Sequence, residues 1–515
     1  MRIFLFFLLC LFIVPFQLIA QIIPKENDTL NYCIIGFSFP GVAKGNSYKI
    51  EIAAGNYKDE STFNRNIIKT EISKVNKIII RVPAFGAAYT WRIIPLRTSS
   101  ETQGSEFHHF STGFFPDLDT ARIRLRIKQS AEKYKDAYVI MDGNRTMYDM
   151  EGAPVWYLPN LGGTIKSNSQ VRDIKLTRQG TITFIVDGRA FDVNYNGKIL
   201  WEGANGRRKT GDSLEGYHHE LMKLSNGHYM VLGFDPVAKP KPLLTDSNGR
   251  RIFTDSVQRR TSRLTSKLQF GTILEYDDTG KLVWEWRAAN YFKHTDMEFY
   301  RKTNGMPEFD IHENSFFFDE KNKVIYLGFR NISQVLKIRY PTGEVMTAYG
   351  KLTYATDSME NHSFCAQHSC KLSDKGFLYL FNNGCGLMAM PKVVMIQEPF
   401  SEKDSLKKIW EYQCPVELVH LEERPVPNSV LINKRYMFTS GGSVSELPDN
   451  SLYVSTNSPY STIFIVNMKK KLLWSANLEK WHDDKKEWQP YSQYRSSIIP
   501  SYDLLENLIW TSAGE

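Results

Sequence analysis

The chain has 515 residues, with 64 Lys and Arg against 56 Asp and Glu and a formal charge of +8. No Lys- or Arg-rich run stands out, so the charge balance gives little support to nucleic-acid binding and mildly favours small anionic substrates. Because this length exceeds one ordinary hydrophobic core, we expect two domains or one large repeat architecture.

Residues 1–20 predict a secretory signal peptide. The segment MRIFLFFLLCLFIVPFQLIA has one Arg, an apolar run and a closing small residue, Ala20, so we expect cleavage before Gln21. A retained membrane anchor is the alternative, although no second apolar run follows. We therefore expect a periplasmic or secreted protein with no stable membrane span once the signal is removed.

Residues 21–120 predict an N-terminal β-sandwich domain. The segments IIGFSFP, SYKIEIAAG, KIIIRVP and AAYTWRIIPL alternate apolar and polar positions between turn signals. This spacing is typical of immunoglobulin and fibronectin type III modules. No catalytic cluster stands out here, so we interpret the region as a structural or docking module. A charged connector over residues 120–135 leads into the second domain, residues 121–515.

One hairpin pattern recurs from Ala137 onward: an apolar strand, a turn, and a strand that closes on an aromatic residue. The copies are VIMDGNRTMYDMEGAPVWYL, AFDVNYNGKILWEG, TILEYDDTGKLVWEW, VLKIRYPTGEVMTAYG, VVMIQEPFSEKDSLKKIWEY and IFIVNMKKKLLWSA. Their closing aromatics are Trp156, Trp201, Trp284, Tyr349, Trp410 and Trp474. Six copies predict an all-β chain whose second domain is a six-bladed β-propeller with inserted loops.

The stretch from Asp310 to Arg330 predicts a β-hairpin with its turn at residues 319–322. His312 and Asn314 are two residues apart and therefore share one face of the first strand. Arg330 lies eighteen residues after His312, so the second strand returns it to the level of that histidine. Two neutral polar side chains and a guanidinium at one end of a hairpin are suited to binding an oxyanion. The alternative is a surface hairpin with a solvated polar end.

Two further histidines stand at repeat-equivalent positions. Gly227 lies eight residues after His219, and Gly376 lies eight residues after His368. His312 opens the corresponding strand of the blade between them. Since the first strand of each blade lines the propeller axis, we expect these three histidines to meet at one mouth of the central channel.

Three other histidines are weaker candidates. His218 is predicted to point to the opposite face of the strand from His219, because neighbouring strand residues face opposite ways. His228 lies beyond a turn, and His294 lies in a long loop.

In these segments the chain resembles the bacterial arylsulfate sulfotransferase family, whose members use no nucleotide sulfate donor. The resemblance spans essentially the whole chain after the signal and rests on HHELMKLSNGHYMVLG (218–233), HENSFFFDEKNKVIYLGFR (312–330), GEVMTAYG (343–350) and QHSCKLSDKGFLYLFNNG (367–384). The family's His-x-Asn-Ser signature, with an Arg eighteen residues after the His, is matched at His312, Asn314, Ser315 and Arg330. Its Gln-His pair is matched at Gln367 and His368, but Ser369 replaces the usual acidic residue.

The resemblance implies a β-sandwich followed by a six-bladed propeller, and a ping-pong transfer of a sulfuryl group from a phenolic sulfate ester to a phenol acceptor. His368 is the implied nucleophile, which carries the group as sulfohistidine. Arg330 and Asn314 are suited to hold the sulfuryl oxygens. A proton or hydrogen bond from His219 or His312 would ease the departure of the phenolate. We expect no cofactor and no metal.

Further substrate contacts are expected from Gln367 and from the last blade. There the resemblance offers Thr439, Ser440 and Ser443, and the spacing does not choose among them. The long stretches 236–270 and 287–309 are predicted to wall the mouth and select the aryl group, with disordered insertions as the alternative. We allow for a homodimer, and the sequence identifies neither the donor nor the acceptor.

Five cysteines follow the signal, at Cys33, Cys365, Cys370, Cys385 and Cys414. An odd number allows at most two disulfides within the chain. Cys365 and Cys370 are candidates for a small loop around His368, and either is a candidate for pairing with Cys385 or Cys414. No Cys or His spacing predicts a closed zinc site.

Two other functions compete with sulfuryl transfer. A quinoprotein-like propeller enzyme is one, because DDTGKLVWEW resembles the tryptophan motif of those repeats. Six copies and no metal-binding cluster in register argue against it. The other is a non-catalytic propeller that binds sulfated or other anionic ligands, which would keep Arg330 without needing His368 as a nucleophile.

Overall fold

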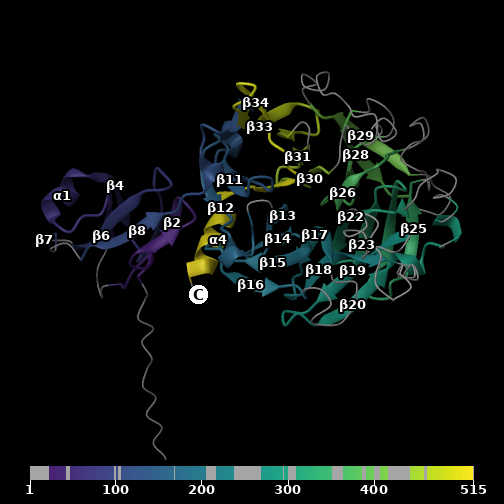
Figure 1. The fold of residues 1–515 in the computed structure, drawn as a ribbon, viewed down its shortest axis with the longest axis horizontal. Coiled ribbons are helices and arrows are strands. Elements are labelled where there is room, and N and C mark those ends of the chain that lie inside the picture. Colours follow the sequence, from purple (N-terminus) through teal and green to yellow (C-terminus); the bar gives the residue numbers. More distant parts are fainter. Residues whose placement is uncertain are drawn as a thin grey trace, which may run out of the picture. The chain divides into compact units, whose positions relative to one another are not determined.

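The computed structural model describes residues 22–41, 47–97, 100–101, 106–166, 169–204, 216–236, 268–293, 295–297, 299, 309–350, 363–384, 390–399, 406–415, 441–456 and 461–513. The predicted signal peptide, Thr439, Ser440, His294, Cys385 and most of the two long loops lie outside these ranges. Nearly all regular structure is β, and the described chain divides into two compact units, with the boundary in the sequence between Gly113 and Phe114 (Figure 1).

The described part of the first unit contains two β-sheets. Its strands are β1 (Asp28–Leu30), β2 (Ile34–Ser38), β3 (Ser47–Ala54), β4 (Ile67–Ser73), β5 (Lys77–Arg81), β6 (Ala88–Arg97), β7 (Ser100–Glu101) and β8 (His108–Thr112). One sheet has the order β1-β8-β6-β3-β4 with β7 beside β6, and the other pairs β2 with β5. The ring of Phe37 in β2 meets that of Trp91 in β6 edge to face at 4.8 Å, so apolar burial joins the sheets.

A short helix interrupts the first unit between β3 and β4. This helix, α1 (Glu60–Arg65), follows Asp59, whose carboxylate accepts the backbone N–H of Thr62 at 2.9 Å. Such a cap satisfies one of the free N–H groups at a helix start. The described part of this unit carries none of the predicted site residues.

Among the residues that the structure describes, the second unit contains six sheets of four or more strands. The first three are β10 (Tyr138–Met141), β11 (Thr146–Asp149) and β12 (Pro154–Tyr157) with β35 (Ser496–Ile499); β13 (Val171–Leu176), β14 (Ile182–Val186), β15 (Arg189–Val193) and β16 (Ile199–Glu202); and β17 (Tyr217–Lys223), β18 (Tyr229–Pro236), β19 (Leu268–Tyr276) and β20 (Leu282–Arg287), with β21 (Phe309–Asp310) beside β19.

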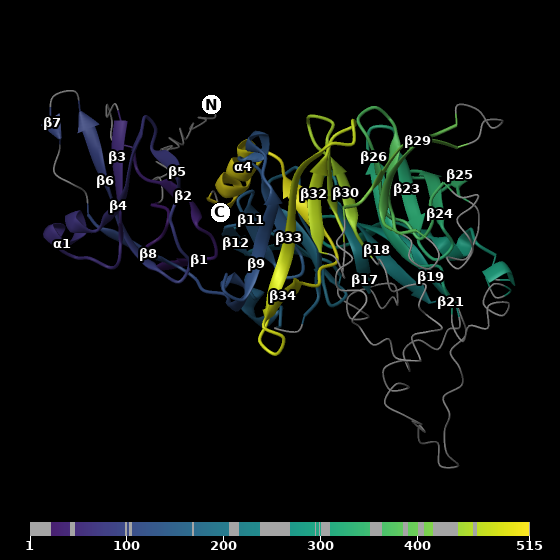
Figure 2. The same cartoon turned by 90° about the horizontal axis from the view of Figure 1, so that it is seen from above.

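The other three are β22 (Glu313–Asp319), β23 (Val324–Phe329), β24 (Gln334–Arg339) and β25 (Val345–Tyr349); β26 (His368–Leu372), β27 (Leu378–Asn382), β28 (Lys392–Gln397) and β29 (Lys407–Gln413); and β30 (Ser443–Glu446), β31 (Leu452–Ser455), β32 (Thr462–Val466), β33 (Leu472–His482) and β34 (Glu487–Pro490). β9 (Ile123–Gln129) pairs with the long strand β33, as Figure 2 shows, and helix α4 (Tyr502–Ala513) follows β35. Each predicted hairpin therefore falls in a different sheet.

Burial explains the sequence pattern of these strands. The middle strands β14 (ITFIV) and β32 (TIFIV) are buried at every residue, because neighbouring sheets cover both of their faces. The outer strand β20 largely alternates between partly buried and exposed positions, and the outer strand β29 is mostly exposed. Continuous apolar runs and broken ones thus mark the middle and the edge of each sheet.

The closing aromatics tie each sheet to the next. Four tryptophans donate a hydrogen bond from the indole N–H to a backbone carbonyl of the next sheet: Trp156 to Tyr195 (2.8 Å), Trp284 to Pro341 (2.8 Å), Trp410 to Met468 (2.9 Å) and Trp474 to Met150 (3.1 Å). Trp201 instead stacks on Tyr229 at 3.9 Å, and the Tyr349 hydroxyl bonds to Glu398 at 2.9 Å. The bond from Trp474 joins the last sheet to the first, so the six sheets form the closed ring visible in Figure 1.

The C-terminal strand β35 completes the first sheet from the inside. It pairs antiparallel with β10, more than 350 residues earlier in the chain. The innermost strands β35, β13, β17, β22, β26 and β30 contact one another in cyclic order. Tyr494 and Arg495, which directly precede β35, are thereby brought among the inner strands.

Candidate active site

The inner strands share an irregularity at one level of the ring. The register with the neighbouring strand shifts after Arg172 in β13, His218 in β17, Glu313 in β22 and His368 in β26. A β-bulge of this kind redirects side chains and often accompanies a functional site. The residue that directly follows the start of the shift has a left-handed φ in three of these strands: 58° at Asp173, 63° at His219 and 50° at Ser369.

His368 is buried, with 1% of its surface exposed. Its Nδ1 lies 2.6 Å from Oδ1 of Asn383, and its Nε2 accepts the backbone N–H of Gly441 at 3.0 Å. Burial, reinforced by the positive charge of Arg330, lowers the pKa of His368 well below its usual value. The imidazole is therefore neutral at neutral pH, the form in which it is a nucleophile.

His219 lies beside His312, with ring centroids 4.9 Å apart, and beside Tyr494 at 5.5 Å. Burial and the neighbouring His218 hold the pKa of His219 well below its usual value. Nδ1 of His218 lies 2.7 Å from Nδ1 of His219. The prediction that these two side chains point to opposite faces is wrong, because the bulge interrupts the strand alternation on which it depended.

His312 is the most accessible of the three predicted histidines, with 29% of its side chain exposed. Its backbone N–H donates to Oδ1 of Asp310 at 2.7 Å, and its Nδ1 lies 3.1 Å from Oδ2 of the same carboxylate. Burial raises the pKa of Asp310, but the bonds from His312 outweigh this and leave that pKa lowered. A carboxylate bonded to Nδ1 orients the imidazole and leaves Nε2 for proton exchange.

The hairpin predicted from Asp310 to Arg330 is confirmed. The backbone N–H of Arg330 donates to the carbonyl of His312 at 2.9 Å, which returns the arginine to the level of the histidine. Nη1 of Arg330 donates to Oδ1 of Asn331 at 2.9 Å. Gln367, directly before His368, donates to the carbonyl of Phe329, directly before Arg330, at 3.1 Å, so His368 and Arg330 belong to one site, and the charge of Arg330 lowers the pKa of His368.

Asn314 and Gln367 tie neighbouring segments together. Nδ2 of Asn314 donates to the carbonyl of Gln367 at 2.8 Å, directly before His368. Nε2 of Gln367 donates to the carbonyls of Phe329 and Gln334 at 3.1 and 2.8 Å. Both side chains are fully buried. In this conformation they position the backbone of the site, and the substrate contacts expected of them stay predictions.

Ser443 and Ser369 belong to adjacent sheets. Oγ of Ser443 donates to the carbonyl of Ser496 at 3.0 Å. Oγ of Ser369 accepts the N–H of Val444 at 3.1 Å and donates to its carbonyl at 3.3 Å. The serine that replaces the family's acidic residue therefore joins β26 to β30. Thr439 and Ser440 lie outside the described ranges, so the choice among the last-blade candidates stays open.

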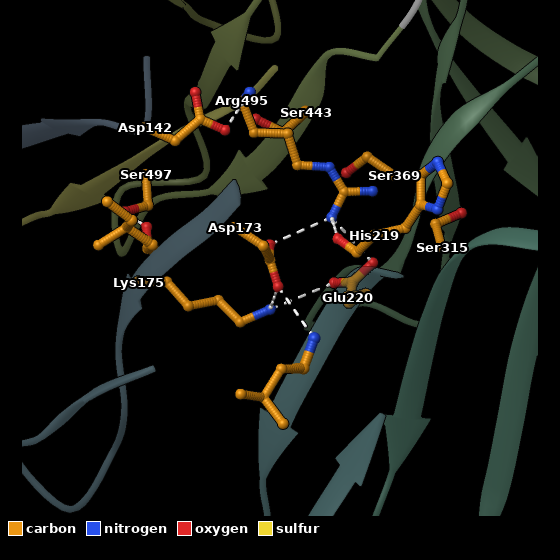
Figure 3. Close-up of polar contacts among 12 residues, drawn as sticks. Asp142, Asp173, Lys175, His219, Glu220, Ser315, Ser369, Ser443, Arg495 and Ser497 are labelled. Atoms are coloured by element: carbon orange, nitrogen blue, oxygen red, sulfur yellow. Dashed lines mark hydrogen bonds and ion pairs between the residues drawn. The ribbon is translucent and has the colours of Figure 1, made fainter. Parts of the chain in front are cut away.

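Arg495, which the sequence analysis did not select, links the inner strands (Figure 3). Its Nη1 donates to Oδ1 of Asp173 at 3.1 Å, to Oε2 of Glu220 at 3.2 Å and to the carbonyl of His219 at 3.1 Å. Its Nη2 donates to the carbonyl of Asn314 at 2.8 Å. One guanidinium thus fixes the bulges of β13, β17 and β22, including the backbone of two predicted site residues.

Two lysines complete this buried ion network. Nζ of Lys371 lies 2.5 Å from Oε1 of Glu220, and Nζ of Lys175 lies 2.7 Å from Oδ2 of Asp173. Burial raises the pKa of Glu220, but the charges of Lys371 and Arg495 outweigh it and hold that pKa below its usual value. The carboxylate stays ionised, which keeps the inner strands bound through charge pairs.

Tyr494 was also missed by the sequence analysis. Its ring lies 5.5 Å from His219 and 6.3 Å from His368, and Cζ of Arg172 lies 5.0 Å from its centroid. Burial raises the pKa of its phenol. No local signal points to Tyr494 and Arg495, because the strand that follows them, β35, has the sequence SSII and lacks a continuous apolar run.

The cysteines narrow the predicted disulfide alternatives. Cys365 is disulfide-bonded, whereas Cys33, Cys370 and Cys414 are free thiols. Pairing of Cys365 with Cys370 or Cys414 is therefore wrong, and so is pairing of Cys370 with Cys385 or Cys414. The partner of Cys365 lies outside the described residues. Burial raises the pKa of the Cys370 thiol well above its usual value, so this thiol beside the site is unreactive.

Two negative findings apply to the part of the chain that the structure describes. In it, no group of three or more His, Cys, Asp or Glu side chains is arranged to hold a metal ion. Within the same ranges, no helix has the length and apolar character needed to cross a bilayer.

A closed ring of β-sheets with histidines gathered at its inner strands defines a propeller-like, all-β protein with a candidate active site. The family model Arylsulfotransferase (ASST) matches residues 124–402, more than half of the chain. The chain therefore belongs to the arylsulfotransferase family, as the resemblance predicted. Family membership supports an aryl sulfotransferase with an aryl sulfate donor and a phenol acceptor, and it speaks against the quinoprotein alternative.

Solved structures give only distant likenesses. A protein of unknown function from Bacteroides caccae is 13% identical with a TM-score of 0.40, covering 71% of this chain and 99% of that one. Apo AztD from Citrobacter koseri is 10% identical with a TM-score of 0.31 and coverages of 88% and 98%. The Dos1 propeller is 9% identical with a TM-score of 0.31 and coverages of 71% and 87%. With TM-scores below 0.5, none of these carries an argument, and curated proteins give no match.

Proposed function

We propose that this protein is an exported aryl sulfotransferase that works by a ping-pong mechanism through a sulfohistidine at His368 and uses no nucleotide donor. The observation that carries the proposal is the state of His368. Burial and the charge of Arg330 keep it neutral, and the N–H of Gly441 identifies Nε2 as the nitrogen with the lone pair. A buried neutral imidazole beside a guanidinium is suited to attack an anionic sulfate ester.

In the first half-reaction, Nε2 of His368 forms a bond to sulfur while the bond from sulfur to the aryl oxygen breaks. The electron pair of the broken bond leaves on the oxygen of the phenolate. Arg330 supplies positive charge for the sulfuryl oxygens, and such a group stabilises the transition state more than the bound substrate. The influence of Arg330 on the pKa of His368 supports this placement.

In the second half-reaction, the oxygen of the acceptor phenol bonds to sulfur and the nitrogen–sulfur bond breaks. The electron pair returns to Nε2 of His368. The phenol proton goes to Nε2 of His312, because Asp310 occupies Nδ1 of that ring. His312 suits this role because its greater exposure lets it return the proton to solvent.

The finer architecture and the export are part of the same proposal. The six sheets tied in a ring support six propeller blades, and the two apolar-packed sheets of the first unit support a β-sandwich. Residues 1–20 have the composition of a cleaved signal. N-terminal sequencing of the exported chain should read from Gln21, and a chain that keeps Met1 would contradict the cleavage.

Incubation of the purified chain with 4-nitrophenyl sulfate, with and without phenol, tests the proposed activity. Nitrophenolate release is expected to depend on phenol in the wild type and to vanish in His368→Ala. His228→Ala is the matched control, because His228 lies between a turn and strand β18 and bonds to Glu275, away from the three histidines. Release that survives in His368→Ala would contradict the role of this residue. A wild type that binds sulfate esters without releasing nitrophenolate would favour the binding propeller.

A further inference from the structure

Three hydrogen bonds join His368, Asn383 and Gly441 into a closed ring. The N–H of Gly441 donates to Nε2 of His368 at 3.0 Å. Oδ1 of Asn383 lies 2.6 Å from Nδ1 of the same imidazole, and Nδ2 of Asn383 donates to the carbonyl of Gly441 at 3.1 Å. His368 and Asn383 are both buried, with 1% and 3% exposed, so water does not compete for these bonds.

This ring of bonds assigns the tautomer of His368. A backbone N–H only donates, so Nε2 is the acceptor and the neutral imidazole carries its proton on Nδ1. That proton is donated to Oδ1 of Asn383. The bond from Nδ2 of Asn383 to the carbonyl of Gly441 fixes the orientation of the amide in agreement with this. Asn383 therefore selects the tautomer whose lone pair lies on Nε2.

We propose that Asn383 is a positioning residue that keeps the Nδ1 proton on His368 through both half-reactions. This inference rests on the proposed function. When Nε2 attacks, the N–H of Gly441 must release the lone pair, and the imidazole becomes a sulfated cation that still carries its Nδ1 proton. A carboxamide oxygen is too weak a base to remove that proton, whereas a carboxylate at the same place would stabilise its loss.

The retained proton decides how easily the sulfuryl group moves on. As the acceptor phenol bonds to sulfur, the nitrogen–sulfur electron pair returns to Nε2. With Nδ1 protonated, the group that leaves is neutral imidazole. Without that proton it is imidazolate, a far stronger base and a poorer leaving group. A neutral amide at residue 383 therefore keeps sulfohistidine reactive, and a carboxylate there makes it persist.

The neighbouring Asn382 provides a matched control. Its Oδ1 accepts the N–H groups of Cys365 at 2.9 Å and Gly384 at 3.1 Å, and it is 2% exposed. It supports the same loop, but no bond joins it to His368 in the described structure. If the only effect of these substitutions were to loosen this loop, Asn382→Ala and Asn383→Ala should lower the reaction rate equally.

Rapid-quench kinetics with 4-nitrophenyl sulfate and phenol test the inference in the full-length mature chain. Asn383→Asp is expected to release one nitrophenolate per chain in a burst and then to transfer the group to phenol at least about tenfold more slowly, with sulfohistidine accumulating. Asn383→Ala is expected to slow the first half-reaction by about 10²-fold, because the ring is no longer held in one tautomer. Added acetamide, which supplies an amide oxygen, should restore part of that rate.

Two results would overturn the inference while leaving the proposed function intact. One is an Asn383→Asp variant whose two half-reactions slow by the same factor, as expected of Asn382→Ala. The other, which applies even if the Asp variant does not fold, is an Asn383→Ala variant that keeps the wild-type first half-reaction. A wild type that turns over without a burst or sulfohistidine would instead contradict the proposed function and remove the basis of the inference.

Discussion

The indole N–H of Trp474, in the last sheet of the ring, donates to the carbonyl of Met150, in the first sheet, at 3.1 Å. Trp474 is fully buried and packs with apolar residues of both sheets. The side chain thus closes the ring next to the backbone closure made by β35. Since the site is built from inner strands of several sheets, closure of the ring is also what assembles the site.

Replacing Trp474 by Phe tests the value of this closing bond. The variant keeps an aromatic ring but leaves the Met150 carbonyl without its donor, so we expect the free energy of unfolding to fall by about 1–3 kcal/mol. Urea denaturation measures the change. Trp284→Phe is the control, because its equivalent bond to Pro341 lies at an exposed position. If the free energy of unfolding falls equally in the two variants, the bond at Trp474 contributes no more to stability than the exposed bond at Trp284.

The buried ion network around Arg495 should be far more sensitive than surface ion pairs. Arg495→Gln leaves Glu220 and Asp173 with less compensating charge while all three positions are buried. We expect a loss of about 3–5 kcal/mol in unfolding free energy, measured by urea denaturation. The additional change Glu220→Gln should recover part of it, since the uncompensated carboxylate is then gone.

The control for this network is the surface pair between Arg122 and Asp483, whose side chains are 56% and 64% exposed. Asp483→Asn should leave the unfolding curve unchanged, because solvent screens exposed pairs. An Arg495→Gln variant as stable as Asp483→Asn would mean that the network does not hold the inner strands together.

Acidification should destabilise the folded chain through its buried histidines. Burial lowers the pKa of His218 to about 4 and holds those of His219 and His368 well below their usual value. Below about pH 6.5 the unfolded chain therefore binds more protons than the folded chain. As a result, the free energy of unfolding decreases as the pH is lowered. Each such histidine adds a slope of about 1.4 kcal/mol per pH unit. Urea midpoints at two pH values should lie closer together in His218→Asn than in the wild type, and an unchanged separation would contradict the assignment.

Arg330→Gln should lower activity and also move its pH dependence. Loss of one preorganised cationic donor is expected to slow nitrophenolate release by about 10²–10³-fold. Because the Arg330 charge helps to lower the pKa of His368, the acidic limb of the first half-reaction should shift to higher pH. Arg339→Gln, which removes an exposed partner of Glu344, is the control. A slowed variant with an unmoved limb would place Arg330 away from the nucleophile.

Local pairing explains which parts of the site could be predicted from the sequence. His312 and Arg330 belong to one hairpin, and the residues of its turn lie between them in the sequence. Their proximity can therefore be predicted by counting residues along the two strands. The same counting from His368 through the turn at Gly376 leads to Asn383, just past the end of β27. The position of Asn383 near His368 could therefore be predicted from the sequence. Its contact with the imidazole was not predicted, because an Asn-Asn-Gly segment is also typical of a turn.

Long-range pairing explains what could not be predicted. Arg495 reaches its partners only because β35 pairs with β10 across the whole second unit, and no local pattern encodes that contact. The bulge after His218 likewise depends on how β17 and β18 fit together, so strict alternation placed His218 on the wrong face. The middle strands were easier to recognise, because burial on both faces imposes an apolar run that is visible in the sequence.

Mass mapping of the chain after reaction with 4-nitrophenyl sulfate, in the absence of phenol, shows whether the sulfuryl group is carried on His368. We expect one added SO₃ group on the peptide that contains His368, lost again when phenol is supplied. The His368→Ala chain should carry no such group. Phenol-dependent turnover by a wild-type chain in which His368 is never modified, even during a rapid quench, would contradict transfer through a sulfohistidine.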